Sequence, residues 1–164
     1  MSSDPLRLLI VDDAPDHAEM VVEFVRLNDG WRDAAIDAVT SYEEAIAALE
    51  RTSFDLAFFD YWLGERTGLM LLRELRTRGV TIPVVILTSR GAEEIAVEAM
   101  KAGAADYLSK TSLTVESLER AVHHAVALRA GEQQRRRAEA ALRASEERFR
   151  ALVENSSEIR KSVV

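Results

Sequence analysis

The chain has no cysteine, and this single absence excludes several classes of site. Without thiols there is no disulfide framework, no zinc site built on thiolates and no cysteine nucleophile, and the composition suits a reducing compartment. Only 3 prolines and 7 glycines occur among 164 residues, so long disordered segments are not expected. No apolar run approaches the roughly 18 residues that a membrane span needs, and polar residues follow Met1 where a signal sequence would be apolar. We therefore expect a cytoplasmic protein that has no membrane partner.

Charge is distributed unevenly along the chain, whose net charge is −7. Residues 1–127 carry 22 acidic and 12 basic side chains, whereas residues 128–164 carry 6 acidic and 9 basic ones. This change near Leu128 predicts one domain of roughly 120 residues followed by an appendage. An acidic domain repels phosphate backbones, and neither part interleaves aromatic residues with basic ones, so we expect no direct nucleic-acid binding.

Short apolar runs alternate with amphipathic stretches through the first part of the chain. The runs predict strands over residues 6–11, 35–39, 56–59, 84–87 and 107–108. Helices are predicted over 15–28, after Ser41 in a capping box with Glu44, around Leu69, around Ile95 and from about Thr114. Parallel strands need long crossover connections, and these connections are helical. The pattern therefore predicts a three-layer α/β fold with a five-stranded parallel sheet and a long C-terminal helical extension.

Polar side chains stand at the carboxyl ends of four predicted strands, where binding sites lie in sheets of this kind. They are Asp12, Asp13, Asp60, Thr88 and Lys110. Any one such aspartate is most often a helix cap or a solvated loop residue, and an isolated lysine is most often a surface residue. Three carboxylates at one edge would repel by about 4 kcal/mol per pair at 4 Å and an effective dielectric constant near 20. Lys110 offsets one negative charge, and Mg²⁺ suits the remaining two.

Five separated motifs resemble those of bacterial two-component receiver domains, the module typified by the chemotaxis response regulator. The motifs read LLIVDD at 8–13, FDLAFFD at 54–60, TGLMLLRELR at 67–76, PVVILTS at 83–89 and AGAADYLSK at 102–110. The resemblance covers nearly all of the first domain. It implies a receiver domain over residues 1–128 whose sheet has the flavodoxin-like strand order 2-1-3-4-5.

The resemblance also implies a role for each residue of the acidic cluster. Asp60 would accept a phosphoryl group from the phosphohistidine of a sensor histidine kinase or a phosphotransfer protein. Asp13 and Asp60 would bind Mg²⁺ directly, Asp12 through water and Trp62 through its backbone carbonyl, while Lys110 would contact the transferring oxygens. Phosphoryl transfer needs mostly positioning and charge neutralisation, which such a pocket provides. Beyond this self-phosphotransfer and its own dephosphorylation, the resemblance implies no enzyme activity.

Two further residues are implied to be the switch. Thr88 would hydrogen-bond the attached phosphoryl group, and Tyr107 would rotate inward as Thr88 moves. In the family this changes the face formed by the fourth helix, fifth strand and fifth helix, and we expect a homodimer through this face, the C-terminal helix, or both. Thr88 could also simply end a strand, and Tyr107 could be an ordinary half-buried aromatic residue. The spacing of Thr88 and Tyr107 from Asp60 and Lys110 favours the interpretation as a switch over these structural roles.

The sequence departs from the family at two places. No proline stands four residues after Asp60, where Gly64 is found, and Thr111 replaces the proline that commonly follows the family's lysine. The usual cis peptide after Lys110 is therefore in doubt. The bulky Trp62 leads to the hypothesis that its indole shields the phosphoryl group from water and slows dephosphorylation.

Residues 129–157 predict a helical linker, because alanine, glutamate, arginine and leucine dominate them. Spacings of three and four residues give a coiled-coil period that is weak at Gly131 and Arg135. One interpretation is a parallel dimer that frays near Gly131, and the other is a solvated helix or domain linker. The positions of the period are Ala121, His124, Leu128, Gly131, Arg135, Ala138, Leu142, Ser145, Phe149 and Leu152.

Residues 142–157 resemble the signalling helix and opening segment of PAS sensor domains, as found in bacterial histidine kinases and cyclic-dinucleotide enzymes. Residues 158–164 would then be a tail or a truncated PAS opening, since no PAS core follows. The resemblance implies a fragment of a receiver–PAS protein.

Other functions with related architectures fit less well. A flavodoxin-like cofactor binder needs a neutral loop after the first strand, where this chain is acidic. A haloacid-dehalogenase-like phosphatase needs an Asp-x-Asp arrangement, and a histidine kinase needs a nucleotide-binding domain. His17, His123 and His124 lie in no phosphoacceptor motif and are predicted to be helix-surface residues. A phosphorylation-independent dimerisation adaptor stays open, and it would dimerise equally with and without a phosphoryl mimic.

Overall fold

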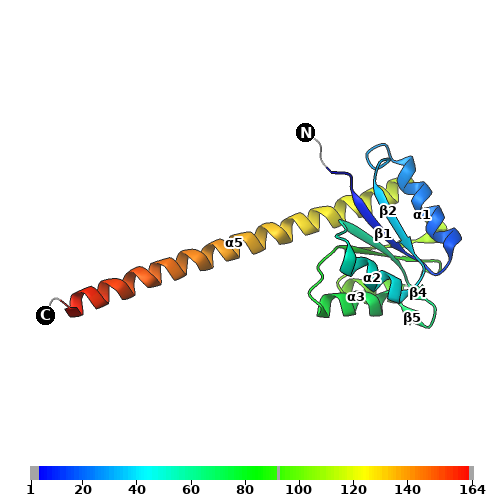
Figure 1. Ribbon diagram of the computed structural model, residues 1–164. Coiled ribbons are helices and arrows are strands. Elements are labelled where there is room, and N and C mark those ends of the chain that lie inside the picture. Colours follow the sequence, from blue (N-terminus) through cyan, green and yellow to red (C-terminus); the bar gives the residue numbers. More distant parts are fainter. Residues whose placement is uncertain (1–3, 92, 163–164) are drawn as a thin grey trace. The chain divides into compact units, whose positions relative to one another are not determined.

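The computed structural model describes residues 4–91 and 93–162 (Figure 1). The chain divides into two units, residues 1–129 and 130–164. The first unit is built on a five-stranded parallel sheet with the order β2-β1-β3-β6-β7. Counted among these five strands, the order is 2-1-3-4-5, which confirms the prediction. The strands are β1 (Arg7–Val11), β2 (Ala35–Val39), β3 (Leu56–Asp60), β6 (Val84–Thr88) and β7 (Asp106–Ser109).

Helices cover both faces of this sheet, so the three-layer architecture is also confirmed (Figure 1). One core layer lies under α2, α3 and α4, and the other lies under α1 and the first part of α5. Along β1, Leu9 and Val11 join the first layer while Leu8 and Ile10 join the second, as the two-residue period of a strand requires. The helices are α1 (Pro15–Leu27), α2 (Tyr42–Arg51), α3 (Gly68–Thr77), α4 (Glu93–Lys101) and α5 (Val115–Ser162).

Helices α1 and α2 begin at the residues that the sequence predicts as helix starts. Pro15 opens α1, where its missing N–H costs nothing. The Ser41 hydroxyl accepts the N–H of Glu44 at 3.2 Å. The Glu44 carboxylate accepts the N–H of Thr40 at 2.8 Å, one residue earlier than in the usual capping box. These bonds fix the point at which the chain leaves β2 and enters α2.

The segment between Asp60 and Gly68, where the sequence predicts neither a strand nor a helix, contains a short antiparallel hairpin. Its strands are β4 (Trp62–Leu63) and β5 (Arg66–Thr67). Strands of two residues carry no readable alternation, so no periodicity could have revealed them. Gly64 makes the tight turn possible because its φ of 67° lies in the left-handed region.

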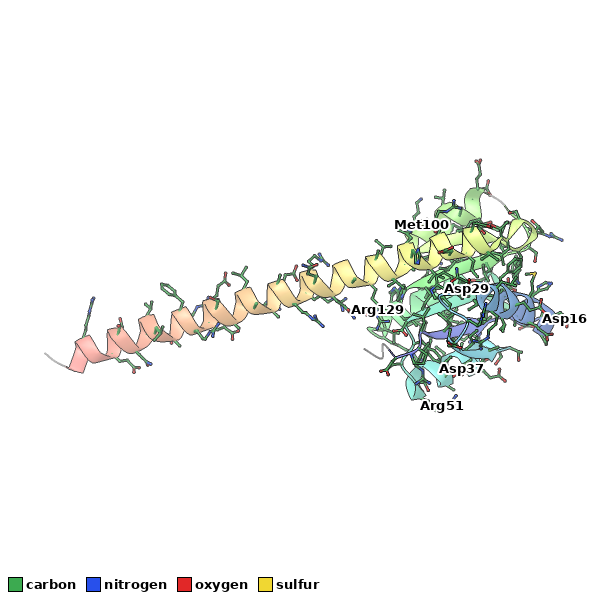
Figure 2. The ribbon with its side chains drawn as sticks, turned by 90° about the horizontal axis from the view of Figure 1, so that it is seen from above. Asp16, Asp29, Asp37, Arg51, Met100 and Arg129 are labelled. Carbon is green, nitrogen blue, oxygen red and sulfur yellow. The ribbon has the colours of Figure 1, made fainter. Side chains whose placement is uncertain are left out.

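Helix α5 continues as one helix through Gly131. A single glycine costs about 1 kcal/mol in a helix, and flanking residues of high helix propensity offset that cost. Within the first unit, the Arg129 guanidinium (labelled in Figure 2) donates to the carbonyl oxygens of Phe54 and Asp55 at 3.0 and 3.2 Å. These bonds hold α5 against the segment that leads into β3.

The second unit is helical, and its described side chains are exposed except that of Glu132, which is half-buried. Leu142, Phe149 and Leu152 expose 60%, 70% and 68% of their surface. They belong to the period that the sequence predicts for a coiled coil, and no described residue of this unit covers them. No described helix of the chain is long and apolar enough to cross a membrane.

Candidate functional site

The polar residues at the strand ends meet at one edge of the sheet. Asp12 directly follows β1, Asp60 and Thr88 end β3 and β6, and Lys110 begins a 3-10 turn directly after β7. In the register of the sheet, Val11 lies beside Phe59 and Asp60 beside Leu87. The sheet topology therefore brings these residues together, as expected for the carboxyl ends of parallel strands. No described peptide bond is cis, including the one after Lys110.

Three carboxylates form a cluster at this edge. One oxygen from each of Asp12, Asp13 and Asp60 lies within 4.8 Å of the others. Asp12 and Asp60 are buried, whereas Asp13 is exposed. The Asp13 carboxylate accepts the N–H of Gly64 at 3.2 Å, so the tip of the hairpin orients it. A proline at this position would have no N–H to donate, and the departure from the family pattern therefore adds a bond to the site.

Lys110 supplies the positive charge of the cluster. Its Nζ lies 2.5 Å from Asp12 Oδ2 and 3.1 Å from Asp60 Oδ1, and its side chain is only 4% exposed. The pKa of Asp60 is nevertheless raised, because burial and the neighbouring Asp12 outweigh the attraction of Lys110. The single ammonium of Lys110 therefore does not neutralise the three carboxylates of the cluster. An open set of carboxylate oxygens fits a hard divalent cation such as Mg²⁺.

His17 belongs to this site although the sequence predicts it as a surface residue. Its Nδ1 lies 3.1 Å from Lys110 Nζ, and the residue comes from the first turn of α1. Its exposure agrees with the prediction, but its contact does not. The sequence gives no signal for this contact, because the direction of a side chain in a first helical turn depends on how the helix docks on the sheet.

The two residues predicted to be the switch lie on neighbouring strands. Thr88 is buried, and its hydroxyl donates to the carbonyl oxygen of Arg90 at 3.1 Å and lies 3.3 Å from the Arg90 backbone N. Tyr107 is half-buried, and its hydroxyl oxygen is buried. This oxygen lies close to Gly91, since a Cβ atom placed on that glycine would be 4.0 Å away from it. Both side chains thus reach the segment that follows β6.

Trp62, predicted to bind Mg²⁺ through its carbonyl, lies in β4, two residues beyond Asp60. Its indole is 54% exposed and packs edge-to-face against Tyr61, with ring centroids 5.0 Å apart. The indole therefore stands at the solvent side of the segment that carries Asp60.

A family profile, described as the response regulator receiver domain, matches residues 8–123. The chain belongs to this family. Receiver domains are signalling modules of two-component response regulators and are generally not enzymes. They interact with histidine kinases or phosphotransfer proteins.

Curated relatives support the assignment over the same region. The transcriptional regulatory protein ZraR of Salmonella typhimurium is 34% identical over 120 residues, which cover 71% of this chain and 26% of ZraR. The response regulator RppA of Synechocystis is 37% identical over 117 residues, which cover 70% of this chain and 48% of RppA. The chain thus spans between about a quarter and a half of the length of these relatives.

Solved structures show the same fold. A two-component response regulator from Clostridium difficile is 28% identical with a TM-score of 0.62, covering 71% of this chain and 92% of that one. A receiver domain protein from Methanospirillum hungatei has a TM-score of 0.67 and covers 79% of this chain and 99% of that one. Its identity of 22% supports the fold alone.

Mg²⁺ should stabilise this receiver domain against unfolding. At 100 times its dissociation constant, a ligand that binds only the folded state raises the free energy of unfolding by about 2.7 kcal/mol. We expect Asp13→Asn to lose most of this gain, because it removes one carboxylate of the cluster. Asp33→Asn, which neutralises an exposed aspartate outside the cluster, is the matched control. Thermal unfolding with and without Mg²⁺ measures both effects, and equal Mg²⁺ shifts in the two variants would contradict the assignment.

Proposed function

We propose that this receiver domain accepts a phosphoryl group on Asp60 from a histidine kinase or phosphotransfer protein, with Mg²⁺. The observation that carries the proposal is the buried Lys110 ammonium, which contacts both Asp12 and Asp60. Such an arrangement places positive charge beside one carboxylate that can act as a nucleophile. Burial alone would only disfavour the ionised form of these aspartates.

In the proposed reaction a carboxylate oxygen of Asp60 attacks the phosphorus of a phosphohistidine. The new O–P bond forms as the P–N bond breaks, and the leaving imidazole nitrogen keeps the electron pair. Lys110 neutralises charge on the transferring oxygens, where preorganised positive charge is most effective. When bound to Asp13, Asp60 and the Trp62 carbonyl, and through water to Asp12, Mg²⁺ would supply further positive charge there.

Incubation with acetyl phosphate and Mg²⁺ tests the proposal directly. The wild-type protein should gain the mass of one phosphoryl group, whereas Asp60→Asn should gain none. Chelation of Mg²⁺ should suppress the gain in the wild type. A folded wild-type protein that binds Mg²⁺ and stays unmodified would count against the proposal. Incubation with a phosphorylated histidine kinase would then show whether Asp60 needs a specific phosphoryl donor or accepts no phosphoryl group at all.

Trp62 should lengthen the lifetime of the phosphorylated state. Its half-exposed indole lies two residues beyond Asp60 and is braced by Tyr61, so it is placed to hinder an approaching water molecule. We expect Trp62→Asn to speed dephosphorylation at least about threefold, equivalent to roughly 0.7 kcal/mol in the barrier. Phe149→Asn, which replaces an exposed aromatic residue of the second unit, is the control. An unchanged lifetime in Trp62→Asn would refute the shielding role.

We propose that the phosphoryl signal acts through Thr88 and Tyr107 on the face formed by α4, β7 and α5. Apolar side chains on α4 support a contact surface there, because Val97 and Met100 (labelled in Figure 2) are 53% and 50% exposed. A local change of charge can bias a surface that has two stable arrangements. This surface would carry the homodimer that the sequence predicts.

The exposed apolar residues of the second unit favour a second candidate, the phosphorylation-independent adaptor. An adaptor would dimerise with the same affinity in the presence and absence of beryllium fluoride, a phosphoryl mimic. A switch would change its dimer affinity, which sedimentation measures.

We also propose that residues 129–157 are a helical linker and that residues 142–157 lead into a PAS domain. The continuity of α5 from Val115 to Ser162 supports the helical linker.

A further inference from the structure

Among the described residues, the Lys110 ammonium has three acceptors, and two of them are carboxylates. An ammonium group has three N–H donors and no acceptor. Asp12 Oδ2, Asp60 Oδ1 and His17 Nδ1 lie 2.5, 3.1 and 3.1 Å from Nζ. The number of acceptors equals the number of donors, so His17 completes the coordination of the ammonium.

We propose that His17 is a positioning residue that holds the Lys110 ammonium through Nδ1 and so sets the rate at which Asp60 is phosphorylated. This inference rests on the proposed function of Asp60. His17 is exposed, whereas Lys110 and its two carboxylate partners are buried, so the imidazole closes the side of the ammonium that faces solvent. A carboxylate in that place would add another negative charge to a cluster that already lacks positive charge.

The geometry also assigns the tautomer of His17. A lysine ammonium can only donate, so Nδ1 must accept and carry no hydrogen. The proton of the neutral ring therefore resides on Nε2, on the far side of the ring from Lys110. An imidazole fixed in this way restrains Nζ between the two carboxylates.

Restraint of Nζ matters because Lys110 acts on charge that develops during transfer. A preorganised cation stabilises that charge without first having to move, whereas a mobile one must reorient during the reaction. Without His17, the third N–H would turn to water at the exposed side of the pocket. The ammonium would then spend less time where the transferring oxygens pass.

Two substitutions of His17 separate this role from a structural one. His17→Asn keeps a hydrogen-bonding oxygen close to the place of Nδ1, whereas His17→Leu fills similar space without an acceptor. We expect His17→Leu to slow phosphorylation by acetyl phosphate about fivefold to tenfold, while His17→Asn stays within about twofold of the wild type. Melting temperatures of both variants report whether they fold normally. Equal rates in the two variants, whether both fast or both slow, would overturn the proposal.

Nitrogen-15 NMR of the imidazole rings tests the contact without any phosphorylation. In the Mg²⁺-free wild type, the unprotonated Nδ1 of His17 should show the chemical shift of a nitrogen that accepts a hydrogen bond, and Lys110→Met should move this resonance to the position of a solvated imidazole. His17→Asn identifies the signals among those of the three histidines. A His17 Nδ1 resonance that is unchanged in Lys110→Met would refute the contact. If Asp60 took up no phosphoryl group, the proposed function would fail, but this spectrum would still decide the contact between His17 and Lys110.

Discussion

Replacing Lys110 with methionine is expected to slow phosphorylation of Asp60 by at least about a hundredfold, the usual cost of removing one preorganised charge donor from a transition state. Methionine keeps much of the side-chain volume but none of the charge. The initial rate of phosphorylation by acetyl phosphate measures the effect. Lys101→Met, which removes an exposed lysine from α4, is the matched control and should react like the wild type.

The same substitution should destabilise the Mg²⁺-free protein at neutral pH. It leaves the buried carboxylates of Asp12 and Asp60 without their cation, and removing one partner of a buried ion pair costs about 3–5 kcal/mol. The pKa of Asp60, which is already raised in the folded state, should then rise further, so the folded state binds more protons than the unfolded state. The difference in free energy of unfolding between the wild type and Lys110→Met should therefore shrink as the pH falls. A Lys110→Met protein as stable and as reactive as the control would contradict the role of Lys110.

Gly68→Ala should damage both the fold and the site. A methyl group at Gly68 would overlap the backbone oxygen of Asp60 and lie 3.2 Å from Cβ of Phe59. Both obstacles belong to the buried strand β3, which cannot move away easily. Overpacking of this kind costs about 1–3 kcal/mol. Because the clash falls on Asp60 itself, we also expect the phosphorylation rate to fall at least about tenfold, through misplacement of the acceptor.

Gly131→Ala is the matched control for this substitution. Nothing lies within 4 Å of a methyl group at Gly131, which stands inside α5. Alanine should therefore leave phosphorylation unchanged and favour the helix locally by about 1 kcal/mol. Chemical denaturation and the rate of phosphorylation measure both variants. A Gly68→Ala protein with wild-type stability and rate would show that β3 tolerates the displacement.

The fold could be predicted from the sequence because its signals are local and agree with one another. Val84 to Leu87 is an apolar run that only a strand covered on both faces explains, and Ser41 with Glu44 marks a helix start. The cluster of Asp12, Asp13, Asp60 and Lys110 followed from one rule, that parallel strands bring their carboxyl ends to a common edge.

The remainder depends on packing that a linear pattern does not encode. The hairpin after Asp60 is too short for periodicity, and its bond to Asp13 arises from the backbone N–H of Gly64, which carries no side-chain signal. The contact of His17 with Lys110 joins residues 93 positions apart and depends on how α1 docks. The pairing of the exposed residues of α5 depends on a second chain, which the sequence of one chain does not describe.

The position of the phosphoryl group tests the central claim most directly, because three carboxylates lie within 4.8 Å of one another. Borohydride reduces an acyl phosphate of aspartate to homoserine, which marks the acceptor permanently. After phosphorylation by acetyl phosphate, reduction and trypsin digestion, peptide sequencing should find homoserine at position 60. Homoserine at position 12 or 13, with aspartate intact at position 60, would contradict the assignment of Asp60 as the acceptor.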